Sequence, residues 1–97
     1  MAQVVYSSYA VENIERAMQF LREKDPEIAS ASATAIRTAV ENLASHPLIG
    51  RRVEGDLREL VISYGATGFI ALYRFDIQRD PVRVLALRHQ REIGYLP

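Results

Sequence analysis

Four side chains near the end of the chain, Arg88, His89, Arg91 and Tyr95, are of the types that move protons at a phosphodiester. An imidazole gives or takes a proton near neutral pH, and arginine neutralises phosphate. His89 is therefore a candidate general acid or base, Arg91 a candidate cation beside it, and Tyr95 a candidate donor or orienting group. A histidine between two arginines at a strand end is more often a hydrogen-bonded structural residue, so this catalytic interpretation competes with a structural one.

A second set of charged side chains is suited to contact with a protein partner. Its members are Arg58, Glu59, Arg74, Arg88 and Arg91. Arg58 and Glu59 are neighbours in a predicted strand and point to opposite faces, so they cannot pair with each other, although either can bridge to an adjacent strand. Tyr73 is assigned to the core. Arg74 faces away from it and is the better candidate for binding a partner's carboxylate.

Three predicted strands position these residues, at 57–64, 69–76 and 82–88. The first alternates between two faces, and the second is apolar on both faces, as expected of an interior strand. A hairpin loop is expected at 65–68, and Pro81 can precede the third strand without interrupting a ladder. The sequence therefore predicts three adjacent antiparallel strands.

Before the sheet the apolar period becomes helical. Val11, Ile14, Met18 and Leu21 form one stripe, with Ser8 as the expected N-cap. A helix of about four turns is predicted here.

A second helix is expected to begin at Asp25 and Pro26, since aspartate caps helices and proline is tolerated at the first helical position. It runs to about Ala44, and its buried stripe is predicted to be Ala29, Ala33, Ile36, Val40 and Leu43. The two helices form an αα-hairpin, and residues 2–6 form a short strand before it. The fold class is therefore α+β, in the order strand, helix, helix and then three strands.

Composition limits the function classes. The 97 residues suit a single domain over 1–97, and the absence of cysteine excludes disulfides and thiolate catalysis. We find no metal-ligand spacing and no phosphate-binding glycine loop, so no metal and no cofactor are expected. No segment is apolar enough for a signal peptide or a membrane span, which predicts a cytoplasmic protein. Residues 1–49 carry four basic and six acidic side chains and residues 50–97 eight and six, which favours the sheet half as the contact surface for an acidic partner.

The order of these elements resembles the RelE/ParE superfamily of bacterial toxins from type II toxin–antitoxin modules. Four segments carry the resemblance: the end of the helical hairpin at 43–50, the strand start at 57–60, the strand at 68–74, and the final segment at 87–91. Together they cover nearly the whole chain.

The resemblance implies a small growth-inhibiting toxin, of the kind that serves plasmid stabilization, neutralised by a cognate antitoxin whose partly disordered segment folds onto it. The expected complex is a hetero-oligomer, and the toxin by itself is expected to be a monomer or weak dimer. A sheet with apolar residues on both faces and one helical hairpin fits this expectation, because some apolar surface can await a partner. The alternative is that the terminal segments cover the second face.

The superfamily divides by target. RelE-like members cut messenger RNA on the ribosome, whereas ParE-like members inhibit DNA gyrase and need no catalytic set. After the aromatic Phe69 this chain has Ile70, where the nucleases keep an arginine, and an aliphatic side chain cannot neutralise a phosphate. Arg51 and Arg52 are at most a remnant of the nucleases' basic residues, and the one lysine, Lys24, is expected far away on the helical hairpin.

The resemblance therefore favours a ParE-like gyrase inhibitor that is not an enzyme. One alternative is a ribosome-dependent messenger RNA endonuclease that uses His89, Arg91 and Tyr95. Another is a non-toxic module that binds antitoxin without arresting growth.

Overall fold

The computed structural model describes residues 2–64, 67–79 and 81–91. Its elements follow the chain as β1 (Val4–Tyr6), α1 (Ser8–Lys24), α2 (Pro26–Glu41), the 3-10 turn η1 (Asn42–Ala44), β2 (Arg51–Glu54), β3 (Leu57–Tyr64), β4 (Thr67–Arg74) and β5 (Val82–His89). The predicted α+β order is confirmed. Neither helix in the described part is long and apolar enough to cross a membrane.

The strands form one five-stranded sheet in the order β1-β5-β4-β3-β2. The three predicted strands are its antiparallel centre, and β4 is an interior strand, as its apolar pattern predicted. Two strands extend this centre. β1 pairs in parallel with β5. β2, four exposed residues for which the sequence analysis predicted no strand, pairs antiparallel with β3.

The first hairpin is tighter than the predicted loop at 65–68. Tyr64 pairs with Thr67 and Ser63 with Gly68, so Thr67 and Gly68 belong to β4. Residues 65 and 66 lie outside the described part of the chain.

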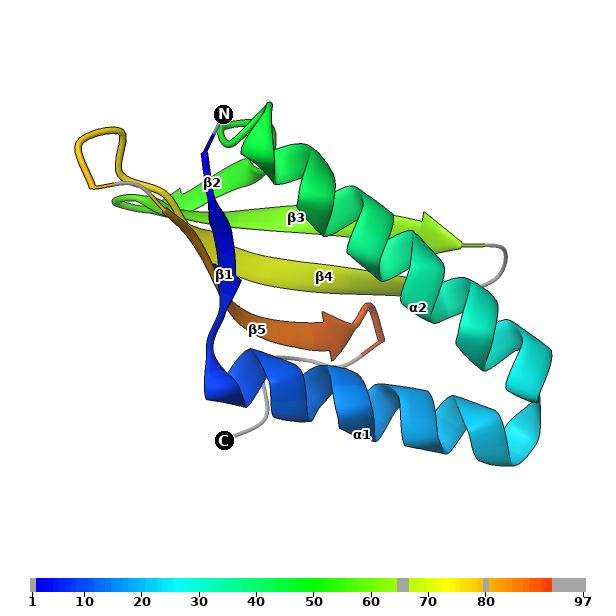
Figure 1. The fold of residues 1–97 in the computed structure, drawn as a ribbon. Helices are drawn as coiled ribbons and strands as arrows, with labels where there is room; N and C mark the ends of the chain where they lie inside the picture. Colours follow the sequence, from blue (N-terminus) through cyan, green and yellow to red (C-terminus); the bar gives the residue numbers. More distant parts are fainter. Residues whose placement is uncertain (1, 65–66, 80, 92–97) are drawn as a thin grey trace.

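Both helices pack on one face of the sheet, as Figure 1 shows. Asp25 caps α2 through its carboxylate, which accepts hydrogen bonds from the N–H groups of Glu27 and Ile28, and Pro26 follows in the first turn, as predicted. The α-helix stops at Glu41 and η1 completes the segment to Ala44. The core between the layers contains Met18, Ile36, Val40, Leu43, Ile62, Phe69, Ala71, Tyr73, Val82 and Val84.

The predictions for α1 need two corrections. Its N-cap is Ser7, not Ser8: Ser7 is still extended because its N–H donates to Val84 O beyond the end of β1, and its hydroxyl accepts from the N–H of Ala10. The inward stripe is rotated as well. Val11 is 41% exposed, while Ala10 and Asn13 are buried.

Asn13 is buried because its side chain gives a backbone group at the edge of the sheet a hydrogen-bond partner. β1 is only three residues long, so the outer edge of β5, on the side away from β4, has no strand beside it after Val84. There the hydroxyl of Ser7 donates to Leu85 O at 2.9 Å, and Asn13 Oδ1 accepts from the N–H of Leu87 at 3.0 Å. Helix α1 thus closes an edge that would otherwise offer its backbone groups to another strand.

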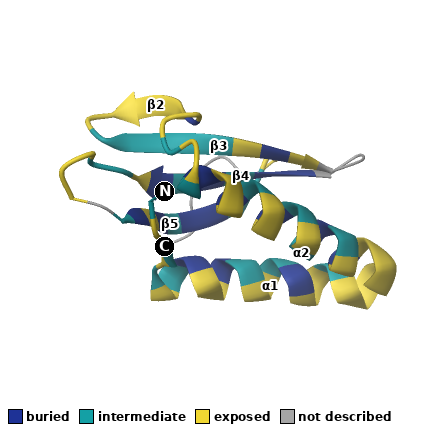
Figure 2. Ribbon diagram, turned by 45° about the horizontal axis from the view of Figure 1, so that its top comes forward, coloured by how far each residue is buried: buried dark blue, intermediate teal, exposed yellow. Residues whose placement is uncertain are grey.

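The sequence analysis did not decide what covers the second face of the sheet. The N-terminal strand does not cover it, since β1 joins the sheet at its edge. Figure 2 shows exposed residues on β2 and part of β3 and on the outer sides of both helices. Residues 92–97 are the C-terminal segment that the sequence analysis considered as another cover for this face, and they lie outside the described residues.

We expect Asn13→Ala to lower the free energy of unfolding by about 1–3 kcal/mol, because the buried N–H of Leu87 would lose its acceptor. Urea denaturation followed by circular dichroism measures this. Gln19→Ala, on an exposed position of the same helix, is the matched control and should change stability by less than about 0.5 kcal/mol. Equal effects of the two substitutions would contradict a structural role for the Asn13 side chain.

Candidate functional site

A groove of about 640 Å³ lies between α1 and the ends of β4 and β5. We call it the α1–β5 groove. Its lining residues are Asn13, Arg16, Ala17, Phe20, Leu21, Lys24, Phe69, Leu87, Arg88, His89 and Arg91. It therefore brings three members of the predicted C-terminal cluster together with one side of a helix.

The lining of this groove is cationic and apolar. Four Arg or Lys side chains and His89 contribute to it, and among the described residues no carboxylate does. Lys24, which the sequence analysis expected far from the C-terminal cluster, lies in the same groove, because α1 lies alongside β5. Its ammonium is 5.0 Å from the centre of the Phe20 ring, a favourable cation–π geometry.

His89 is held by two contacts that suit a structural residue. Its ring meets Phe69 edge-on, with centroids 5.6 Å apart, and Nδ1 accepts the backbone N–H of Arg91 at 3.1 Å. That bond occupies one of the two nitrogens a general base can use. Tyr95, the third predicted catalytic residue, lies outside the described residues, so its place relative to His89 is still a prediction.

At the other end of β4, the buried Tyr73 holds a turn. Its hydroxyl donates to Pro47 O at 2.8 Å and accepts from the N–H of Gly50 at 2.8 Å. Burial raises the pKa of Tyr73, although its hydrogen bond with Gly50 opposes this shift. Tyr73 is a core residue, as predicted, and its hydroxyl fixes the turn at 47–50.

Arg58 lies beside Tyr73 and binds the same turn. One of its guanidinium nitrogens donates to Leu48 O at 3.1 Å and to Gly50 O at 2.9 Å. Gly50 is required there, since a Cβ would lie 2.6 Å from the Tyr73 ring and 2.8 Å from the carbonyl oxygen of Glu59. Arg58, predicted as a partner contact, is therefore engaged within the chain.

The locked turn presents large apolar side chains to solvent. Leu48 is 54% and Ile49 57% exposed, and Ile77, in the loop after β4, is 79% exposed. With Phe75 they surround a hollow of about 440 Å³. We call Leu48, Ile49, Phe75 and Ile77 the apolar loop patch.

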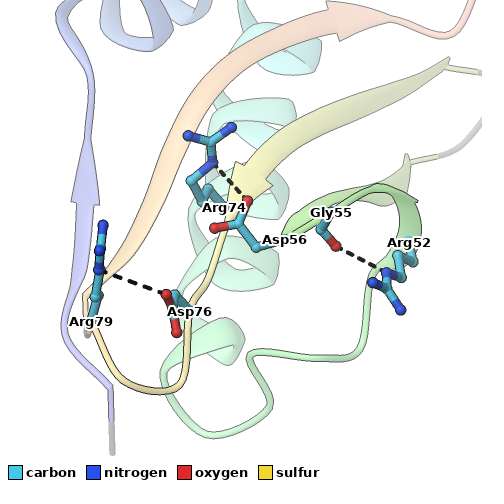
Figure 3. Close-up of polar contacts among 6 residues, drawn as sticks. All are labelled: Arg52, Gly55, Asp56, Arg74, Asp76 and Arg79. Atoms are coloured by element: carbon cyan, nitrogen blue, oxygen red, sulfur yellow. Dashed lines mark hydrogen bonds and ion pairs between the residues drawn. The ribbon is translucent and has the colours of Figure 1, made fainter.

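Two other predicted contact residues, Glu59 and Arg74, form ion pairs within the chain. Glu59 pairs with Arg51 across β2 and β3, so it does bridge to an adjacent strand. Arg74 pairs with Asp56 at 3.0 Å, and Figure 3 shows this pair near the bond from Arg52 to Gly55 O. Both side chains of the Arg74–Asp56 pair are exposed, and such surface pairs contribute little to stability. Arg74 is thus still a candidate for a contact that replaces Asp56.

Sequence reasoning missed Arg16 and Asn13. Both follow from the spacing of α1, because Asn13, Arg16 or Ala17, Phe20 and Lys24 recur at three or four residues. Asn13 interrupts an apolar stripe, a sign of a buried polar partner. Among the described residues no group of three or more His, Cys, Asp or Glu side chains could hold a metal ion.

We expect Tyr73→Phe to lower the free energy of unfolding by about 1–3 kcal/mol, because the buried N–H of Gly50 and the carbonyl of Pro47 would each lose a partner. The raised pKa of Tyr73 adds a pH signature. Its contribution to stability is complete below the unfolded value of about 10 and is lost as pH rises through the higher folded value. The difference between the two proteins should therefore shrink above about pH 10.

Tyr9→Phe is the matched control for this measurement. The Tyr9 hydroxyl is buried and has no hydrogen-bond partner in the described structure, so its removal should be neutral or stabilising. A Tyr73→Phe protein as stable as the Tyr9→Phe protein at neutral pH would show that the turn is not held by the hydroxyl.

Comparison with known proteins now connects this geometry to a family. The chain is 30% identical to "Toxin RelE3" of Caulobacter vibrioides over 92 residues, which are 95% of this chain and 98% of that protein. It is 34% identical to "Toxin RelE2" of the same organism over 62 residues, 64% of this chain and 70% of that protein.

A solved structure has the same fold. It is titled "Chromosomal ParDE TA system from P. aeruginosa" and superposes with a TM-score of 0.75 at 17% identity, over 92% of this chain and 96% of that one. The family model described as "ParE toxin of type II toxin-antitoxin system, parDE" matches residues 4–94, so the chain belongs to the ParE toxin family, within the RelE/ParE superfamily.

Proposed function

We propose that this toxin arrests bacterial growth by binding DNA gyrase, and that a cognate antitoxin silences it in a cytoplasmic hetero-oligomer. In this proposal the toxin is not an enzyme and uses neither metal nor cofactor. It acts by protein contact alone.

The observation that carries the proposal is the apolar loop patch. A buried tyrosine, an arginine and an obligatory glycine hold the turn at 47–50, and that turn exposes Leu48 and Ile49. Large apolar side chains on a rigid turn lose little conformational entropy on binding, which is typical of the centre of a protein interface. Exposing them in water has no benefit for the fold itself.

The strand position after Phe69 supports the same conclusion. Ile70 is half-buried, paired with Val61 on one side and Arg88 on the other. The resemblance described above places the nucleases' arginine here. In this chain an aliphatic side chain occupies that position in the sheet. A nuclease built on it would lack the arginine that neutralises the scissile phosphate.

A second candidate is RNA cleavage, and the α1–β5 groove favours it. Arg16, Lys24, Arg88 and Arg91 could together hold a phosphate backbone beside His89. The RelE names of the two Caulobacter relatives agree with this reading. The engagement of His89 Nδ1 by the N–H of Arg91 weighs against it.

Pulse labelling of DNA and protein synthesis in bacteria distinguishes the two targets. In the first minutes after induction without antitoxin, we expect DNA synthesis to fall before protein synthesis. The double variant His89→Ala, Arg91→Ala should arrest DNA synthesis as the unaltered toxin does, because neither residue belongs to the apolar loop patch. An earlier fall in protein synthesis that the double variant abolishes would establish the nuclease instead. No arrest at all would indicate a non-toxic antitoxin-binding module.

The patch itself can be tested by charging it. We expect the double variant Leu48→Asp, Ile77→Asp to lose growth arrest, because buried carboxylates would oppose contact with the target. Since both side chains are more than half exposed, the melting temperature should change by only a few degrees. Val11→Asp, which charges an exposed apolar position on α1, is the control and should retain arrest. Full arrest by the patch variant would exclude the patch as the target surface.

A further inference from the structure

We infer that residues 92–97 fold back across the face of the sheet opposite the two helices and cover its apolar centre. We call this side of the sheet the open face. The inference gives the C-terminal segment a place in the fold and sets the face on which Tyr95 lies. It holds whichever target the toxin has.

The alternation of each strand shows which side chains point to the open face. Leu72 lies between Ala71 and Tyr73, which are fully buried in the core between the sheet and the helices, so Leu72 points the other way. Ala86 is directly opposite Leu72 in the antiparallel pair of β4 and β5. Opposite residues of such a pair share a face, so Ala86 and Leu72 form a row across the open face.

A second row lies beside the first. Ile70 is two positions before Leu72 on β4 and therefore points to the same side. It pairs with Arg88 of β5 and with Val61 of β3. The open face thus has an apolar centre on β4 and β5, formed by Ile70, Leu72 and Ala86.

This apolar centre is withdrawn from water, although a sheet face with nothing on it is solvated. Ala86 is only 3% exposed, yet it is not part of the core between the sheet and the helices. Ile70 and Leu72 are half-buried. Val61, on the same face but one strand further out, is 57% exposed. The burial is therefore local to β4 and β5, as a narrow covering segment would produce.

No helix or strand in the described part of the chain supplies this cover. Both helices lie on the other face, as Figure 1 shows, and β1 and β2 lie at the two edges of the sheet. The longest stretch outside the described residues is 92–97, and it follows β5 after only two residues.

The direction and length of the chain suit this path. Gln90 N–H still donates to Gly68 O at 3.0 Å, and Arg91 N–H donates to His89 Nδ1 at 3.1 Å, which closes a turn at the end of β5. Six extended residues reach about 20 Å, whereas Ala86 is about 10 Å from His89 along the strand. The segment is therefore long enough to run back over both rows.

The side chains of the segment match the surface that it would cover. Three of its six residues, Ile93, Tyr95 and Leu96, are large and mainly apolar. Placing them on Ile70 and Ala86 would remove apolar area from water on both sides of the contact, which is favourable.

This path also separates Tyr95 from His89. His89 pairs with Phe69 and meets its ring, and Phe69 is 2% exposed in the core on the side of the helices. A tyrosine on the open face would be across the sheet from that imidazole. The two would then not act on one phosphodiester, which agrees with a toxin that is not an enzyme.

Nuclear Overhauser effects in the free, full-length toxin, labelled at the methyl groups of Ala, Ile and Leu, test the path directly. We expect contacts from the methyl groups of Ile93 and Leu96 to those of Ile70, Leu72 and Ala86. Contacts from Ile93 or Leu96 to methyl groups of the α1–β5 groove would overturn the inference. The absence of any long-range contact from these two residues would overturn it as well.

Stability gives a second, independent readout. We expect the double variant Ile93→Asp, Leu96→Asp to lower the melting temperature by about 10 °C, because charged side chains cannot cover the apolar centre. The matched control is Leu48→Asp, Ile77→Asp, which makes the same chemical change at two exposed positions and should shift it by only a few degrees. Equal shifts in the two proteins would contradict the proposed cover.

Discussion

The hydrogen bond between Asn13 and the N–H of Leu87, buried between the first helix and β5, is the contact on which the α1–β5 groove depends. It fixes the first helix along a strand edge that β1 is too short to cover. Because the helix is held there, Arg16, Phe20 and Lys24 face the end of β5 and the groove exists. The same bond occupies the N–H of Leu87, a backbone group on the outer edge of β5 that an added strand would otherwise use.

A second set of polar contacts lies at the far end of β4. Tyr73 and Arg58 use buried and partly buried hydrogen bonds to fix a turn whose apolar side chains are exposed to water. Both sets of contacts join segments that are apart in the sequence. One shapes the α1–β5 groove, and the other exposes the apolar loop patch. In the function proposed here, one of these surfaces, the apolar loop patch, binds the target.

Local signals were sufficient for both α-helices and for four of the five strands, but not for the contacts between them. Asp25 and Pro26 predict the start of the second helix, and the apolar pattern of 69–75 predicts a central strand. Both signals depend on neighbouring residues alone. β2 was missed since a short, exposed and charged edge strand has no apolar pattern to detect. Asn13, Gly50 and the approach of Lys24 to His89 depend on how the hairpin lies on the sheet, which no short window of sequence contains. The roles of Arg88 and Arg91 toward a partner are still predictions.

The most direct test is a map of the toxin's contacts with DNA gyrase by nuclear magnetic resonance, using methyl-labelled toxin. We expect the methyl signals of Leu48, Ile49 and Ile77 in the apolar loop patch to shift or broaden when gyrase is added, while those of Leu21 and Leu87 in the α1–β5 groove stay unchanged. Changes confined to the α1–β5 groove, with the apolar loop patch unaffected, would contradict a target surface on the patch.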